Sequence, residues 1–423
     1  MWGLSGYGAR ASTRAPDWRT LVGNANSGEP SALRIYLDHN ATTPIRPEVI
    51  EAMQAVLRDE YGNPSSVYAE GAAARERVEE ARAEVAALLG VVPAEVRFTG
   101  GATEANNAIV FGLLGPGDHV VTTQVEHPSI DEPLACLEPH GLAGRPARWT
   151  EGRGIAVTRV APDEAGCVDA GDVAEAIRPE TKLVTMIWAN NETGAIQPVA
   201  QVAELCGPRD VLFHSDATQA IGKTSVDLSR LPVDFVSSSA HKLGGPKGVG
   251  ALVGRRNSSL PAFLRGGGQE RGLRGGTENV ASIVGYGVAC ALARREAAER
   301  EKRSGALRDR MWQGIQRSVE RVRWNGDPAR ALRNTLSVEF EGVAGEVLVQ
   351  ALDLEGVAVS AGAACHSGSI EPSKVLVAMG RTPEQARGSL RLSVGWGVDE
   401  QQIDRAVALL AELVPRAREV EAP

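Results

Sequence analysis

The sequence lacks an apolar run long enough to span a bilayer, so we expect no transmembrane helix. Its five cysteines are scattered and include no C-x-x-C pair, which argues against a disulfide framework or a structural zinc site, and we expect no metal. Such cysteine use fits a reducing cytoplasm, where we expect the protein to act. Excess positive charge is also missing. The formal net charge of −8 argues against nonspecific binding to nucleic acid.

The length of the chain favours more than one domain. A chain of 423 residues is too long for one simple core, so two domains are expected. Residues 1–33 show little periodic apolar pattern and no apolar core of a signal peptide. Arg10, Arg14 and Arg19 give this segment a faint likeness to a transit peptide, but we favour a disordered tail or a misassigned start codon.

From Ile35 onward, short β-branched runs alternate with helical patterns, and no internal repeat is apparent. This alternation predicts an α/β fold with a largely parallel sheet wrapped by helices. Ligands of such sheets bind beyond the carboxyl ends of the strands. The predicted strands cover 96–99, 120–123, 183–187, 211–214, 235–237 and 250–253, and the predicted helices cover 47–58, 69–89, 103–114, 129–138, 199–206, 279–318, 345–355 and 399–418.

The most informative stretch is 237–248, where Lys242 stands among small residues and glycines just after the apolar run 233–236. An amine in an open turn at the end of a buried strand can form a Schiff base with an aldehyde cofactor. Burial lowers the pKa of such an amine toward its reactive form. Taken alone, a lysine in this position is more often a solvated loop residue.

A second strand end carries a glycine turn. Gly100 and Gly101 separate the predicted strand 96–99 from the helix that includes Thr103. Free N–H groups and the dipole at a helix start suit a phosphate, and Thr103 can add a hydroxyl. The pattern is weak by itself, because many turns of this kind bind no ligand.

Polar residues follow three more predicted strands. Asp216 can keep a pyridine nitrogen protonated, or else cap the following turn. Gln219 can bond a phenolic oxygen, or be a polar residue of the first turn. His127 can stack on a flat ring and shuttle protons, although a lone histidine is more often structural. Asn191 can bind a ring oxygen or a substrate carboxylate, or simply form a turn with residues 192–194.

Arg391 and Cys365 complete the candidate set. The run 389–394 alternates with period two, which places Arg391 on the face opposite the leucines. A guanidinium there can clamp a carboxylate, or be solvated on an edge strand. Cys365 lies on a loop of Ala, Gly and Ser, where a thiol can be exposed and can move, as a sulfur carrier requires. The alternative is an inert cysteine.

Together these motifs resemble the cysteine desulfurases, a family of fold-type I pyridoxal phosphate enzymes within aminotransferase class V. The resemblance covers nearly everything from Ile35 to about Gly397 and departs from the commoner family forms only at His39 and Thr218. Neither departure removes a catalytic group. Further stretches that carry the resemblance are 36–44, 62–66, 266–271, 274–279, 360–368 and 389–393.

The resemblance implies an architecture and a cofactor. A large domain, residues 46–293, would hold pyridoxal 5′-phosphate on a mostly parallel seven-stranded sheet. Residues 34–45 and 294–423 would form a smaller α+β domain that carries the mobile cysteine loop. The charged helical stretch at about 287–318 would connect the two domains, with its charges on a solvated face.

The resemblance also implies a role for each candidate residue. Lys242 matches the Schiff-base lysine, Cys365 the nucleophile, His127 the histidine that stacks on the ring, Asp216 the partner of the pyridine nitrogen and Gln219 the partner of the phenolic oxygen. Thr103, Ser239 and His241 match phosphate ligands, Thr277 matches a phosphate contact from the second subunit of a homodimer, and Asn191 and Arg391 match the groups that hold the substrate carboxylate.

The implied activity is the conversion of L-cysteine to L-alanine, with the sulfur left on Cys365 as a persulfide. An iron–sulfur scaffold or a tRNA-thiolation protein would then accept the sulfur. The main alternative is a selenocysteine lyase, whose cysteine loop looks similar. A sulfur-relay protein without turnover would not need the complete set of site residues, and an aminotransferase would have no use for Cys365.

Overall fold

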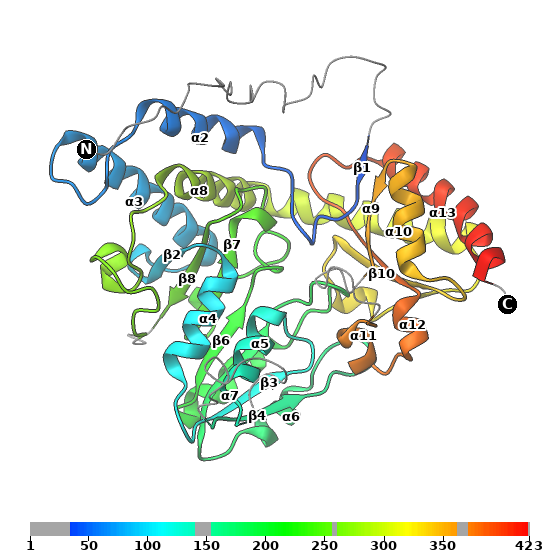
Figure 1. Cartoon of the computed structure of the whole chain (residues 1–423), viewed down its shortest axis with the longest axis horizontal. Coiled ribbons are helices and arrows are strands. Elements are labelled where there is room, and N and C mark those ends of the chain that lie inside the picture. Colours follow the sequence, from blue (N-terminus) through cyan, green and yellow to red (C-terminus); the bar gives the residue numbers. More distant parts are fainter. Residues whose placement is uncertain (1–33, 140–153, 256–259, 362–370, 422–423) are drawn as a thin grey trace, which may run out of the picture. The chain divides into compact units, whose positions relative to one another are not determined.

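The computed structural model describes residues 34–139, 154–255, 260–361 and 371–421, and two main sheets organise them (Figure 1). The predicted tail at residues 1–33 lies outside these ranges. Within the ranges, no helix combines the length and the apolar character that crossing a membrane requires.

The larger sheet has seven strands in the order β2-β8-β7-β6-β5-β3-β4. Five neighbouring strands pair in parallel, namely β7, β6, β5, β3 and β4. Strand β8 is antiparallel to both of its neighbours, β2 and β7. The predicted α/β fold with a mostly parallel sheet is therefore confirmed. The strands are β2 Val96–Thr99, β3 His119–Thr123, β4 Ala156–Val160, β5 Thr181–Ile187, β6 Leu212–Asp216, β7 Phe235–Ser239 and β8 Gly250–Gly254.

Successive residues of the central strands point to opposite faces of this sheet. Val120 and Leu183 belong to a buried cluster shared with α4 Ala102–Leu113 and α5 Pro128–Leu137. The next residues along, Val121 and Val184, belong to a second cluster shared with α3 Ala69–Leu89 and α8 Val280–Arg295. Helices therefore cover both faces, which explains why the strand sequences are continuous apolar runs. The unpredicted strand β4 is an edge strand whose residues are mostly exposed or half-buried.

The prediction of one continuous helix over residues 279–318 is wrong. The stretch 279–318 forms two helices, α8 Val280–Arg295 and α9 Ala297–Ser318, separated at Glu296 (φ −100°, ψ 3°). Arg46 Nη1 donates to the Glu296 carboxylate at 2.8 Å, which links the joint to a distant part of the chain. The remaining helices are α2 Pro47–Asp59, α6 Ala170–Ala176, α7 Val199–Cys206, α10 Gly345–Leu354, α11 Lys374–Ala378, α12 Pro383–Arg387 and α13 Glu400–Glu421.

The second sheet is antiparallel, in the order β12-β13-β10-β9. Beside it, β1 Ile35–Tyr36 pairs in parallel with β11 Val357–Ala358, so the start of the described chain packs with its C-terminal part. Leu37 shares one core with residues of α9, α10 and α13. The domain boundaries at residues 45 and 293 stay a prediction. The strands of this sheet are β9 Val322–Trp324, β10 Thr335–Phe340, β12 Ser360–Ala361 and β13 Ser389–Ser393.

Candidate active site

The carboxyl ends of the parallel strands meet at a cavity of about 700 Å³, a size suited to a small-molecule site. Strands β3, β5, β6 and β7 each end beside a polar residue that lines it. The lining includes nine residues predicted from the sequence: Thr103, His127, Asn191, Asp216, Gln219, Ser239, His241, Lys242 and Arg391.

Two predicted site residues are not part of this lining. Thr277 is exposed and lies just before α8. Cys365 lies outside the described residues, and so does the loop around it. The lining also includes Lys247, which the sequence analysis did not assign although it stands in the same glycine-rich stretch as Lys242.

Lys242 ends a short 3-10 turn, Ala240–Lys242, that follows β7 directly. Its Nζ donates to the backbone oxygens of Asn40, at 2.6 Å, and Ala41, at 2.7 Å. The amine is therefore half-buried and bonded to a distant chain segment rather than solvated on a loop. A lysine held in this way has a fixed position at the cavity wall.

Asp216 ends β6 and is 4% exposed. Its Oδ1 accepts from the backbone N–H of Thr218 at 3.0 Å, so part of the predicted turn-capping role is present. Its Oδ2 accepts from Asn106 Nδ2 at 2.7 Å, and the same amide group donates to Ser129 Oγ at 2.8 Å. Asn106 was not assigned from the sequence. The available signal was an asparagine on the otherwise apolar buried face of α4.

His127 caps the N-terminus of α5. Its Nδ1 accepts from the backbone N–H of Ser129 at 3.1 Å and lies 2.8 Å from the Ser129 hydroxyl. Burial lowers the pKa of the imidazole, and this effect, aided by Lys242, outweighs the opposite effect of Asp216. A neutral ring whose Nδ1 accepts this bond carries its proton on Nε2. His127 is thus both a structural cap and a neutral ring beside the cavity.

The glycine turn between β2 and α4 forms another part of the wall. Gly101 precedes the first residue of α4 with φ +144°, a conformation that strongly favours glycine. A Cβ on Gly250 of β8 would lie only 2.8 Å from the Gly101 Cα, so the turn packs closely against the neighbouring strand. Thr103 in the first helical turn and Ser239 at the end of β7 also line the cavity. These features suit an anion at the helix N-terminus.

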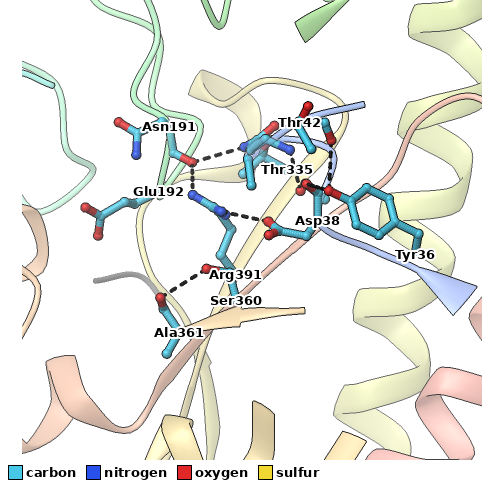
Figure 2. A network of polar contacts seen from close by, with 12 residues as sticks. Tyr36, Asp38, Thr42, Asn191, Glu192, Thr335, Ser360, Ala361 and Arg391 are labelled. Atoms are coloured by element: carbon cyan, nitrogen blue, oxygen red, sulfur yellow. Dashed lines mark hydrogen bonds and ion pairs between the residues drawn. The ribbon is translucent and has the colours of Figure 1, made fainter. Parts of the chain in front are cut away.

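Arg391 lies on β13 between β12 and β10, so the edge-strand alternative is wrong. Figure 2 shows its guanidinium between Asn191 and Asp38. Nη1 donates to the Asn191 backbone oxygen at 3.0 Å, and Nη2 lies 2.7 Å from Asp38 Oδ1. Nε is buried and has no hydrogen-bond partner among the described residues. Because an unpaired buried donor is costly, Nε is suited to receive a ligand oxygen.

Asn40 joins several of these side chains and was not assigned from the sequence. It is 1% exposed, and its backbone oxygen accepts from Gln219 Nε2 at 2.9 Å as well as from Lys242. Its Nδ2 donates to the backbone oxygen of Asn191 and to Thr335 Oγ1. Asn40 therefore links the lysine, the glutamine and the carbonyl that orients the arginine.

Comparisons with known proteins agree on the relatives of this chain. The family model described as aminotransferase class-V matches residues 35–406. A cysteine desulfurase IscS of Dechloromonas aromatica is 42% identical over 396 residues, which is 92% of this chain and 94% of that protein. The chain belongs to the aminotransferase class-V family. A cysteine desulfurase IscS of Methanosarcina thermophila is 38% identical over 388 residues, or 91% of this chain and 93% of the relative.

Solved structures of related proteins share the fold of this class-V enzyme. A NifS-like protein superposes with a TM-score of 0.82 at 34% identity and covers 91% of this chain and 100% of its own. SspA, solved in complex with cysteine, gives a TM-score of 0.73 at 33% identity and covers 85% of this chain and 99% of its own. The chain is thus an enzyme of the cysteine desulfurase branch, and its cofactor is pyridoxal 5′-phosphate.

The cavity of this class-V enzyme fits that cofactor. The glycine turn suits a phosphate, and the buried carboxylate of Asp216 lines the same cavity. Thr218 Oγ1 is buried, belongs to a residue of the lining, and has no partner among the described residues. An unpaired hydroxyl of this kind is expected where a polar ligand binds.

A second cavity of about 660 Å³ lies beside the first, and the two share Asn191. Five acidic residues that were not assigned from the sequence line it, and Glu126 and Glu192 are two of them. Burial raises the pKa of Glu126 to about 8 and that of Glu192 to about 7. Glu126 Oε1 accepts from Thr123 Oγ1 at 2.7 Å and from the Ile187 N–H at 2.8 Å. Glu126 therefore ties β3 to the end of β5 behind the active site.

Proposed function

We propose that this enzyme is a cysteine desulfurase, which converts L-cysteine to L-alanine and transfers the sulfur to Cys365 as a persulfide. The observation that carries the proposal is the convergence of Lys242, Asp216 and Arg391 on one cavity, in a chain 42% identical to a cysteine desulfurase over 92% of its length. The geometry supports a half-buried amine, a buried carboxylate and a carboxylate clamp in one place.

The proposed cofactor contacts follow from the lining. Thr103, Ser239 and His241 would hold the phosphate, and Lys242 would hold the cofactor through its amine. Asp216 would face the pyridine nitrogen, Gln219 the phenolic oxygen and Asn191 the ring region. When bound, the cofactor supplies an electron sink for the electrons released at the substrate Cα.

The chain's own residues then handle the substrate. Arg391 would bind the substrate carboxylate through its unpaired Nε, with Asn191 beside it. The Lys242 amine, once free, would take the proton from the substrate Cα, and its backbone partners at Asn40 and Ala41 would orient it. His127, neutral with its proton on Nε2, would stack on the cofactor ring and pass protons.

Cys365 would complete the reaction. Its thiolate would form an S–S bond with the substrate sulfur while the C–S bond of the substrate breaks. The electron pair of the C–S bond would stay on the carbon, which takes up the proton lost by the substrate thiol and becomes the methyl group of alanine. The persulfide would then pass to an acceptor protein, such as an iron–sulfur scaffold or a tRNA-thiolation protein.

We also propose that the enzyme is a homodimer in which Thr277 reaches the phosphate of the partner subunit. Support comes from Thr277, which is exposed and does not line its own cavity. Further support comes from apolar side chains near the junction of α2 and α3. Tyr61 is 87% exposed, Val67 96% and Tyr68 58%, and a second copy of the chain would cover such a surface.

The proposal can be tested by mass spectrometry of the protein after incubation with L-cysteine. We expect one added sulfur atom on Cys365 in the wild type and none in Cys365→Ala, which should keep its bound cofactor. Cys136→Ala, a change at a half-buried cysteine on α5, is the matched control and should still carry the persulfide on Cys365. A persulfide that appears on another cysteine in Cys365→Ala would contradict the proposal.

A further inference from the structure

The Gln219 carboxamide has one well-defined orientation. Its Nε2 donates to the Asn40 backbone oxygen at 2.9 Å, and its Oε1 accepts from Lys223 Nζ. Lys223 Nζ also donates to Asn40 Oδ1 at 2.9 Å. The amide is therefore held at both ends, by a carbonyl that can only accept and by an amine that donates.

The opposite orientation of this amide is disfavoured twice. A flip would place Oε1 against the Asn40 carbonyl oxygen, where two acceptors would meet. It would also place the NH₂ group against the Lys223 amine, whose N–H would lose Oε1 as its acceptor. Since an amide NH₂ has two N–H bonds and Asn40 takes one, the second remains for the cavity that Gln219 lines.

The turn that follows β6 brings Lys223 to the Gln219 carboxamide. Lys223 lies four residues after Gln219, and its backbone N–H donates to the Ala220 oxygen at 3.0 Å in the turn that follows β6. Gly222 precedes it with φ +74°, and a Cβ there would approach Leu243 Cδ2 to 2.8 Å. The turn just before Lys223 therefore strongly favours glycine at position 222.

We propose that Lys223 is a positioning residue that fixes Gln219 as a hydrogen-bond donor toward the cavity. This inference rests on the proposed cofactor site, where Gln219 would donate to the phenolic oxygen of pyridoxal 5′-phosphate. Lys223 acts through Gln219, so its effect depends on that side chain. Without Lys223, only the Asn40 carbonyl opposes the flip. A flipped amide would turn its oxygen toward the phenolic oxygen, which replaces an attraction with a repulsion.

A double-mutant cycle on the full-length holoenzyme tests this coupling. The rate of pyridoxal 5′-phosphate loss is followed by absorbance, together with the position of the visible band of the bound cofactor. We expect Lys223→Met and Gln219→Ala each to speed cofactor loss by roughly three- to tenfold, the effect of one hydrogen bond. The double variant should lose cofactor no faster than Gln219→Ala alone.

Two further variants keep the test decisive. Gln219→Glu keeps an acceptor for Lys223 but removes the donor, so it should lose cofactor about as fast as Gln219→Ala. Lys223→Met leaves Asn40 Oδ1 with a donor, Asn334 Nδ2 at 3.1 Å, which should preserve the fold. Ser304→Ala is the control, because Ser304 lines the small cavity that Lys223 also lines. It should behave as the wild type.

The outcomes separate this inference from the proposed function. Three results would overturn the positioning role. The first is additivity of the effects of Lys223→Met and Gln219→Ala on cofactor loss. The others are a folded Lys223→Met protein with an unchanged rate of cofactor loss and an unchanged visible band, and a Gln219→Glu protein that loses cofactor at the wild-type rate. A wild-type protein that binds pyridoxal 5′-phosphate but forms no alanine from L-cysteine would instead overturn the proposed function.

Discussion

At the scale of single residues, the site fixes its polar groups before any ligand arrives. Nη1 of the Arg391 guanidinium is held by Asn191 and Nη2 by Asp38, and the buried Nε has no partner among the described residues. Such preorganisation lowers the cost of ordering the site when substrate binds. The substrate carboxylate would therefore meet a guanidinium whose position and plane are already set.

Arg391→Lys tests this clamp. Lysine keeps the positive charge but loses the planar set of donors that Asn191 and Asp38 hold. We expect the KM for L-cysteine to rise about tenfold to hundredfold, the effect of losing charge-assisted bonds of roughly 1.5–3 kcal/mol. Steady-state kinetics measure this change. Arg323→Lys, at a partly exposed pair with Glu339, is the control, and an equal rise in KM there would contradict the clamp.

Asn106→Leu tests the buried support of Asp216. The variant removes the donor to Asp216 Oδ2 and to Ser129 Oγ, both buried, so we expect the free energy of unfolding to fall by about 1–3 kcal/mol. Denaturant unfolding measures the loss. The neighbouring Asn107→Leu changes a half-buried side chain that donates to the Thr103 backbone oxygen at 2.9 Å and should cost less. Equal losses would show that Asn106 has no special role.

At the scale of elements, strand ends were predictable from the sequence and long-range hydrogen bonds were not. The alternation of 389–394 predicted the direction of Arg391, because Leu390 and Leu392 do enter the core. The role of Asn106 depends on how α4 packs against β6, which no local pattern encodes. Asn40 was missed for the same reason, since its partners lie far away in the sequence.

The division of the predicted helix 279–318 shows the same limit. Helical residues flank Glu296 on both sides, so periodicity alone gave one continuous helix. The Glu296 carboxylate at this joint accepts from the Arg46 guanidinium, which lies in a distant part of the chain. Local propensity sets where helices can form, and tertiary contacts decide where they break.

Glu126→Gln tests the connection between β3 and β5. The folded protein raises the pKa of Glu126 to about 8 by burial, so it holds this proton more tightly than the unfolded chain does. The associated stability is present at acidic pH and is lost as the pH rises through about 8. Glutamine mimics the protonated form at every pH and keeps an oxygen for Ile187 and Thr123.

Thermal or denaturant unfolding at pH 6 and pH 9 measures this effect. From the lower to the higher pH, the stability of Glu126→Gln relative to the wild type should improve by more than about 1 kcal/mol. Glu132→Gln, at another carboxyl of the same cavity, serves as the matched comparison and should show no such improvement. A constant difference for Glu126→Gln would mean that its carboxyl is ionised throughout this range.

At the scale of the whole molecule, the apolar surface near α2 and α3 supports association of two chains. We expect light scattering to give twice the mass of one chain for the wild type. Val67→Asp should shift the protein toward single chains, because it places a charge in the proposed interface. Leu354→Asp, at a residue 87% exposed at the end of α10, is the control and should stay dimeric. A wild-type protein of single-chain mass would contradict the dimer.

The most direct test of the central claim is the release of alanine from L-cysteine and from L-selenocysteine, measured side by side for the wild type and Cys365→Ala. We predict that the wild type forms alanine from L-cysteine and that this activity vanishes in Cys365→Ala. A strong preference for L-selenocysteine that the substitution barely changes would contradict the assignment as a cysteine desulfurase and the role of Cys365 as the sulfur acceptor.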